Sequence, residues 1–398
     1  MTESLDVATF TRISTSIEPE WLAQETLDMC QIQSVTMSEH EVCRHFASRL
    51  RALGLSVDER EVTPGRFNLY SRIVGVGDGP TLALNGHIDT VPIYNAWPPR
   101  RDGDRILGRG ATDMKGGMAA LLGAARALIN SGTKLKGDLL LSAVVGHEEA
   151  IAKKDGPRAF VADLRSGRIT ADAILIAEGA QELWVMSMGS ANFTIELNSD
   201  SGGAHTDNTP FGRNPIRFLG ELIDRVHAKQ RELDDGVSHP LAGHERIDLG
   251  IVQAGDLYNR TPTRCTVLGT RRWAPGKTVI DIQRELAELV APIAAAGRLT
   301  PEIVIEQERE PFETSAEHPA VVATRRAAEH VMGSSPRLVG RRVVGDANIY
   351  ANGAAIPAYY FGPMNDSLHS DHEWVSIKQI TECARIYLGT AMGFCGVS

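Results

Sequence analysis

Short apolar runs alternate with longer segments of helical spacing along most of the chain. The runs at residues 81–86, 138–145 and 171–177 have the length and apolar character of buried strands. In residues 118–129 and 375–393 apolar side chains instead recur every three or four positions, which predicts helices with one buried face. This alternation predicts an α/β fold, in which a mixed, mostly parallel sheet is flanked by helices.

The order of elements changes near residue 187. The chain then reads strand, helix, strand, strand, helix, strand, at residues 193–197, 215–229, 247–253, 264–272, 278–296 and 302–307. That order is typical of the β-α-β-β-α-β, or ferredoxin-like, sandwich. After residue 311 the α/β pattern returns. We therefore predict an α/β domain made of residues 1–188 and 310–398, with an α+β domain inserted at residues 189–309.

Composition and charge narrow the class of protein. The 398 residues include 42% hydrophobic and 23% charged positions, which is ordinary for a globular chain. A net charge of -9 argues against a nucleic-acid or anionic membrane partner and suits cation binding. Residues 1–16 lack the pattern of a signal peptide, and we expect a cytoplasmic protein. The cysteines contain no CxxC pair, so a disulfide framework or a thiolate zinc site is not expected.

Imidazole and carboxylate side chains follow the strand-like runs, where each run ends. They are His87 and Asp89, Glu148 and Glu149, Glu178, and, across a short loop, His369. A further acid, Asp113, lies in the glycine-rich segment 108–117, just before a predicted helix. Because ligands of open α/β sheets bind at the carboxyl ends of the strands, we expect these side chains to meet at one edge.

Each of these side chains has an ordinary explanation when it is taken alone. A histidine at a strand end can be satisfied locally, an acid before a helix can cap it, and adjacent glutamates commonly lie in solvent. Together, two imidazoles and three carboxylates without a thiolate suit zinc, cobalt or manganese. Asp89 lies two residues from His87, on the same side of an extended chain, and can orient its ring. His147 has no assigned partner.

These residues lead to a hypothesis for the chemistry. The predicted cation ligands are His87, Asp113, Glu149, Glu178 and His369. Two cations that share Asp113 would lie about 3.5 to 4 Å apart, as in other two-metal hydrolytic sites. Glu148 is not needed as a ligand, so it can take a proton from the activated water and pass it to a leaving nitrogen.

Several of these segments resemble one family, the co-catalytic zinc peptidases and deacylases. The segments are residues 86–92 and 108–117, the pair Glu148 and Glu149, Glu178, and His369 with Glu373. The family includes acetylornithine deacetylase, succinyl-diaminopimelate desuccinylase, aminoacylase and bacterial glutamate carboxypeptidase. The resemblance covers essentially the whole chain, with the motifs in the right order. It implies a catalytic α/β domain that is interrupted by a smaller dimerisation or lid domain. We expect a homodimer, because the free face or an edge strand of the inserted sheet can pair with a second copy.

The resemblance also implies roles for single residues. It places His87 and Glu178 on one metal ion, Glu149 and His369 on the other and Asp113 between them, with Glu148 as general base. In the inserted domain, His205 resembles the histidine that reaches the other subunit's active site and steadies the oxyanion. Asn259 and Arg272 resemble contacts to a substrate carboxylate. By chemistry alone, His205 is equally a surface histidine, and other arginines crowd around Arg272.

The sequence departs from the family pattern at a few positions. His147 stands where many members carry an acid, Ala150 where glycine is frequent, and Gly179 where proline is frequent. His372 lies close to His369, although the spacing favours His369 as the ligand. We predict a two-metal hydrolase that cleaves an N-acyl or peptide-like bond of a small carboxylate-bearing substrate. The alternatives are a dipeptidase or glutamate carboxypeptidase, and a non-catalytic metal-binding homologue.

Overall fold

The computed structural model describes residues 6–96 and 98–398, which divide into two compact units. The first unit comprises Met1–Val185, Thr314–Val339 and Ile349–Ser398, and the second Met186–Glu313 and Gly340–Asn348. The second unit thus begins three residues before and ends four residues after the predicted insertion, 189–309. It also takes in Gly340–Asn348, which the sequence analysis placed in the first domain.

The first unit is built on a mixed sheet. Its strands lie in the order β1 (Asp58–Thr63), β2 (Arg66–Ile73), β6 (Leu139–Val144), β3 (Leu82–His87), β7 (Ala173–Ala180), β15 (Ala358–Gly362) and β8 (Leu183–Ser187). The central pairs β3 with β6, β3 with β7, and β7 with β15 are parallel, whereas β1, β2 and β8 run antiparallel to their neighbours. The residues of β3 and β6 are all buried, as their unbroken apolar runs predict. The predicted fold class is confirmed.

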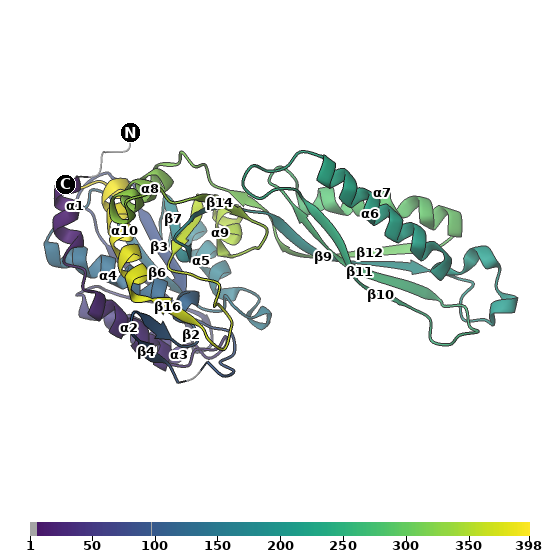
Figure 1. Ribbon diagram of the computed structural model, residues 1–398, viewed down its shortest axis with the longest axis horizontal. Helices are drawn as coiled ribbons and strands as arrows, with labels where there is room; N and C mark the ends of the chain where they lie inside the picture. The colour runs from purple at the N-terminus through teal and green to yellow at the C-terminus, as the bar shows by residue number, and fades with distance from the viewer. Residues whose placement is uncertain (1–5, 97) are drawn as a thin grey trace. The chain divides into compact units, whose positions relative to one another are not determined.

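Helices cover this sheet. Helices α4 (Gly116–Ser131) and α10 (Ile377–Cys395) pack against β3 and against each other, while α3 (His40–Ala52) and α5 (Asp155–Ser166) pack on β2. In Figure 1 the strands β3, β6 and β7 run between α4 and α10 on one side and α5 on the other. Outside residues 186–313 the chain also forms the helices α1 (Val7–Ser14), α2 (Pro19–Gln31), α8 (Pro319–Met332) and α9 (Asp346–Ala354).

The second unit has the predicted β-α-β-β-α-β order. Its elements are β9 (Gly189–Asn198), α6 (Leu219–Asp235), β10 (Arg246–Ala254), β11 (Arg264–Trp273), α7 (Val279–Gly297) and β12 (Thr300–Arg309). The strands form an antiparallel sheet in the order β10-β11-β9-β12, with α6 packed on β10 and α7 on β12. Apolar side chains of both layers, among them Phe193, Trp273 and Leu286, form its buried core.

The structure contains further elements that the apolar pattern did not predict. Besides α1, α5, α9 and β8 they include the short strands β4 (Arg100–Asp102), β5 (Arg105–Leu107), β13 (Phe312–Glu313), β14 (Leu338–Arg341) and β16 (Trp374–Ser376). Strands β16, β5 and β4 form a separate small sheet, which holds the segment before Ile377 beside the glycine-rich loop. All five cysteines are free and buried. Among the described residues, the helices include none with the length and apolar character to cross a membrane.

Candidate metal centre

The glycine-rich segment folds into a tight turn, η1 (Ala111–Lys115), between β5 and helix α4. A side chain at Gly117 would place its Cβ 1.9 Å from the carbonyl oxygen of Ala177, so only glycine fits there. The start of α4 is therefore pressed against the end of β7, where Glu178 follows Ala177. This close approach brings Asp113 to the carboxyl edge of the parallel strands, as the sequence pattern predicts.

A buried ion pair fixes the backbone around Asp113. Glu373 accepts hydrogen bonds from the backbone N–H groups of Thr112 and Asp113, at 3.1 and 3.2 Å. Its other oxygen accepts from Arg109 Nη1 at 2.5 Å, and both side chains are almost fully buried. Burial raises the pKa of Glu373, and the charge of Asp113 raises it further, whereas Arg109 and a backbone hydrogen bond oppose the shift. Arg109 was not predicted as a site residue, although it is a charged residue inside the glycine-rich segment.

Arg109 also donates hydrogen bonds to two other loops. Its Nε donates to the carbonyl of Pro92 at 2.9 Å, and its Nη2 donates to the carbonyl of His369 at 3.4 Å. His369 has a φ of 59°, in the left-handed region that a residue with a side chain seldom adopts. One guanidinium therefore connects the loop after β3, the turn of Asp113 and the loop of His369.

The carboxylate of Asp113 lies between two imidazoles. Asp113 Oδ1 is 3.1 Å from His87 Nε2, and Asp113 Oδ2 is 3.0 Å from His369 Nε2. His369 Nε2 is also 3.3 Å from Glu148 Oε2, and the side chain of Glu148 is only 6% exposed. The two oxygens of one carboxylate thus face residues from separate parts of the chain, an arrangement suited to bridging two cations.

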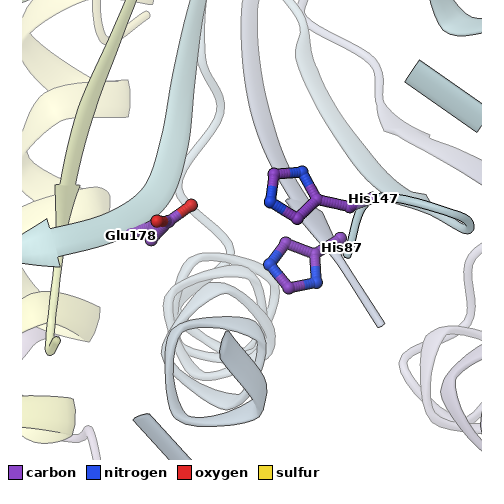
Figure 2. Close-up of side chains that lie close together, drawn as sticks. All are labelled: His87, His147 and Glu178. Atoms are coloured by element: carbon purple, nitrogen blue, oxygen red, sulfur yellow. The ribbon is translucent and has the colours of Figure 1, made fainter. Parts of the chain in front are cut away.

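Two groups of side chains have the proximity needed to hold a cation. One group is His87, Asp113 and Glu148, and the other is His87, His147 and Glu178; within each group the ligand atoms lie within 4.8 Å of one another. Figure 2 shows the second group, with the His147 ring over the His87 ring and Glu178 across from both. His147, for which the sequence predicts no role, therefore lies in the cluster.

Asp89 holds the segment that follows β6. Its carboxylate accepts hydrogen bonds from the Thr36 hydroxyl at 2.7 Å and from the backbone N–H groups of His147 and Glu148 at 3.0 and 2.9 Å. His87 Nδ1 lies 3.1 Å from the backbone carbonyl of Asp89 and 3.7 Å from its carboxylate. The closer contact of the ring is thus to the main chain of Asp89, and the predicted orienting role of its carboxylate stays a prediction.

The remaining predicted site residues belong to neither cation group. Glu149 is in neither cation group, and its backbone N–H donates to Thr36 Oγ1 at 3.2 Å. His372 is exposed, so it is His369 that meets Asp113. In the second unit, Asn259 Nδ2 lies 3.4 Å from His205 Nε2, and Arg272 Nη1 lies 3.3 Å from Glu308 Oε2. The roles predicted for His205, Asn259 and Arg272 stay predictions.

The titratable groups of this cluster strongly shift one another's pKa values. Burial alone would lower the pKa of His87, but hydrogen bonding and charge from Asp113, with the charges of Glu148 and Asp89, raise it well above its usual value. Hydrogen bonds to Asp113 and Glu148 raise the pKa of His369 to about 10. Burial would raise the pKa of Asp113, yet the two imidazoles hold it well below its usual range. Without a cation, the cluster therefore holds protons.

The donor atoms fit divalent cations. Imidazole nitrogens and carboxylate oxygens are the ligands that zinc and similar ions prefer, and each group here offers both kinds. Among the described residues, Glu148 Oε1 is buried without a hydrogen-bond partner, which is costly unless a cation or water satisfies it. Both observations support a metal centre at this edge of the sheet.

Cation binding by this cluster should strengthen as the pH rises. In the cation-free chain His369 keeps its proton to about pH 10, and an imidazole binds a cation only when it is neutral. If each cation displaces one proton, the affinity for zinc should rise about tenfold per pH unit from about pH 6 to 9. Calorimetric titration in buffers of different ionisation enthalpy measures the released protons. An affinity that stays constant across this range would contradict the prediction.

An α/β sheet with paired cation groups at its carboxyl edge is the arrangement of a two-metal hydrolase. Residues 83–393 match peptidase family M20/M25/M40, and the chain belongs to this family. It is 26% identical over 378 residues to the N-formyl-4-amino-5-aminomethyl-2-methylpyrimidine deformylase of Bacillus subtilis, a match that covers 88% of each chain.

Solved structures show the same fold. Aminopeptidase PepT from Bacillus cereus superposes with a TM-score of 0.78 at 18% identity, over 95% of this chain and 99% of that one. The YXEP protein of Bacillus subtilis, described as a dinuclear metal binding peptidase from the M20 family, superposes with a TM-score of 0.70 at 18% identity, over 97% and 98% of the two chains. The predicted family and enzyme class, metal-dependent hydrolases of amide bonds, are confirmed.

Proposed function

We propose that this chain hydrolyses an amide bond, N-acyl or peptide-like, in a small substrate that carries a carboxylate, with two divalent cations that are zinc or, in its place, cobalt or manganese. The observation that carries this proposal is the position of Asp113, whose two oxygens lie 3.1 and 3.0 Å from His87 and His369. The names of the relatives are consistent with it, since a deformylase and a peptidase both break the C–N bond of an amide.

Each cation would have its own set of protein ligands. His87 and Glu178 would hold one, Glu149 and His369 the other, and Asp113 would contact both. When bound, such cations lower the pKa of a water molecule and polarise the carbonyl of the amide. The side chains supply the rest: Arg109 and Glu373 fix the loop of Asp113, and Asp89 fixes the backbone after β6.

The segment after β6 has two tasks in this proposal. It provides a cation ligand, and the sequence predicts that it also provides the group that accepts a proton from water and returns it to the leaving nitrogen. The sequence predicts that Glu148 transfers the proton and that Glu149 binds the cation. For the substrate carboxylate we propose Arg272 with Asn259, because a guanidinium fork matches a carboxylate, and for the oxyanion His205.

The same chemistry leaves a second candidate substrate class. A dipeptidase or glutamate carboxypeptidase would use the same cations and differ only in the shape of its substrate pocket. A non-catalytic homologue would keep the fold without turnover. We propose that the chain forms a homodimer through its second unit, because strand β10 is an edge of that sheet and most of its residues are exposed.

A substrate panel tests the proposed function. N-formyl, N-acetyl and N-succinyl amino acids, dipeptides and tripeptides would be incubated with the purified chain and added zinc, cobalt or manganese, and release of the amine would be measured. We expect turnover of at least one N-acyl amino acid or dipeptide, its loss on chelation, and its return when the metal is restored. Esterified substrates, which lack the free carboxylate, are the matched control and should be cleaved more slowly. A chain that binds two cations but cleaves no amide would contradict the proposal.

A further inference from the structure

The segment between α2 and α3 lies beside the continuation of strand β3. The backbone N–H of Thr90 donates to the carbonyl of Ser34 at 2.9 Å, and the N–H of Thr36 donates to the carbonyl of Thr90 at 3.0 Å. The hydroxyl of Ser34 donates to the carbonyl of Ile88 at 2.9 Å. These bonds form a short parallel pairing past the end of β3 and place Thr36 next to Asp89.

The hydroxyl of Thr36 connects Asp89 with the segment that follows β6. Its Oγ1 lies 2.7 Å from Asp89 Oδ2 and 3.2 Å from the backbone nitrogen of Glu149. An ionised carboxylate only accepts hydrogen bonds and a backbone N–H only donates them, so the hydroxyl donates to Asp89 and accepts from Glu149. The side chains of Thr36 and Asp89 are both buried, so water cannot readily replace this hydroxyl.

Asp89 extends the effect of this hydroxyl to the candidate metal centre. Its carboxylate also accepts the backbone N–H groups of His147 and Glu148, at 3.0 and 2.9 Å, and its backbone carbonyl lies 3.1 Å from His87 Nδ1. Of the three donors named here, the Thr36 hydroxyl is the one that belongs to a side chain. A substitution of Thr36 therefore changes the support of Asp89 without altering a proposed cation ligand.

The turn that carries Thr36 has a strained backbone. The N–H of Ser38 donates to the carbonyl of Val35 at 2.8 Å, which closes a turn with Thr36 and Met37 at its centre. Met37 has a φ of 77°, at a position where turns with positive φ usually carry glycine. Its side chain is 46% exposed, so burial of the methionine does not account for this conformation. Such strain persists where surrounding contacts enforce it, often at functional sites, and here those contacts include the hydrogen bonds of Thr36.

A second anchor holds the same segment, so the loss of one hydroxyl should not unfold it. Glu39 accepts the backbone N–H of Gly146 at 3.1 Å and pairs with Arg66 through both carboxylate oxygens, at 2.8 and 2.9 Å. Both side chains of this ion pair are buried. The pair connects the start of α3 with the start of β2 and does not involve Thr36. Variants of Thr36 can therefore be compared as folded chains.

We propose that Thr36 is a positioning residue for amide hydrolysis. Its hydroxyl fixes the carboxylate of Asp89 and the backbone of Glu148 and Glu149, and thereby the orientation of the side chains that these residues and His87 present to the cations. This inference rests on the proposed function. It gives a segment that precedes the family match an effect on cation affinity and on turnover.

Two substitutions separate the hydroxyl of Thr36 from its packing. Thr36→Val keeps the shape of the side chain and removes both hydrogen bonds, whereas Thr36→Ser keeps the hydroxyl. Bound zinc would be measured at buffered free zinc concentrations, and kcat and KM at saturating zinc on the best substrate of the panel. Losing a residue that supports a metal ligand costs about 10- to 100-fold, so we expect Thr36→Val to lower zinc affinity and kcat by about that factor. KM should change little, because Thr36 supports groups that act in the transition state, and Thr36→Ser should retain most of the affinity and turnover.

Thr26→Val is the matched control. Thr26 is also fully buried, and its hydroxyl donates to the carbonyl of Leu22 at 2.8 Å within helix α2. This variant loses a buried hydroxyl as well, but it should keep the zinc affinity and kcat of the unaltered chain.

The opposite results overturn the proposal. They are unchanged zinc affinity and kcat in Thr36→Val, or a Thr36→Ser or Thr26→Val chain that is as impaired as Thr36→Val. Should Thr36→Val fail to fold, Thr36→Ala takes its place with the same expectation, and unchanged affinity again overturns the proposal. If the unaltered chain binds zinc but cleaves no amide, the proposed function is contradicted, while the zinc affinities of the variants still decide whether Thr36 positions the centre.

Discussion

Replacing Asp113 by alanine should remove both cations and lower kcat/KM on the order of a thousandfold or more. Asp113 contacts both imidazoles of the centre and is the proposed bridge, so its loss would remove a ligand from each cation and leave His87 and His369 without their shared partner. A thousandfold loss corresponds to about 4 kcal/mol of transition-state stabilisation, within the range that a bound metal supplies. Metal analysis and steady-state kinetics on the best substrate of the panel measure both effects.

The matched control for this variant is Asp78→Asn. Asp78 is an exposed acid in the loop before β3, at the amino end of the strand that delivers His87. That variant should keep both cations and turn over substrate normally. An Asp113→Ala chain that still holds two cations at the free zinc concentration that saturates the unaltered chain would contradict the bridging position of Asp113.

Replacing Arg109 by leucine should destabilise the first unit by about 3–5 kcal/mol, the usual effect of removing one partner of a buried ion pair. The change would leave the Glu373 carboxylate buried beside Asp113 without its counter-charge, and the loops of Pro92 and His369 without a shared donor. Urea unfolding, followed by circular dichroism, measures the loss. Cation affinity should fall as well, because Glu373 holds the backbone N–H groups of Thr112 and Asp113.

Arg168→Leu provides the comparison for Arg109. Arg168 also pairs with a carboxylate, that of Asp58 at 2.7 Å, but both side chains are more than 40% exposed. Exposed pairs contribute about 0–1 kcal/mol, so this variant should unfold at nearly the urea concentration of the unaltered chain. Equal effects of the two substitutions would show that the Arg109 pair does not organise the loops around it.

The sequence predicts the fold and the edge of the sheet because both depend on local patterns. Continuous apolar runs mark β3, β6 and β7, and parallel strands end at one edge, which places His87 and Glu178 together. The helix α5 was not predicted, although it buries Phe160 and Val161, because it follows a charged stretch, Lys153 and Lys154, and has Gly156 and Pro157 in its first turn.

Interactions between distant segments could not be predicted from the sequence. Arg109 and Glu373 lie 264 residues apart, and no local pattern pairs them. The hydrogen bonds that hold the acidic pair could not be predicted from the sequence either. Asp89 accepts the N–H of Glu148 and Thr36 Oγ1 accepts the N–H of Glu149, across 59 and 113 residues of chain. Residue types identified the chemistry, and the separate roles of Glu148 and Glu149 stay predictions.

The hydroxyl of Thr36 connects the N-terminal region to the candidate metal centre. The family match begins at residue 83, after helices α1 to α3. The Thr36 hydroxyl donates a hydrogen bond to Asp89 and accepts one from the backbone N–H of Glu149. The Glu39 carboxylate accepts a hydrogen bond from the backbone N–H of Gly146. A chain that began at residue 83 would retain every proposed metal ligand but would lose Thr36 and Glu39, which hold the backbone after β6.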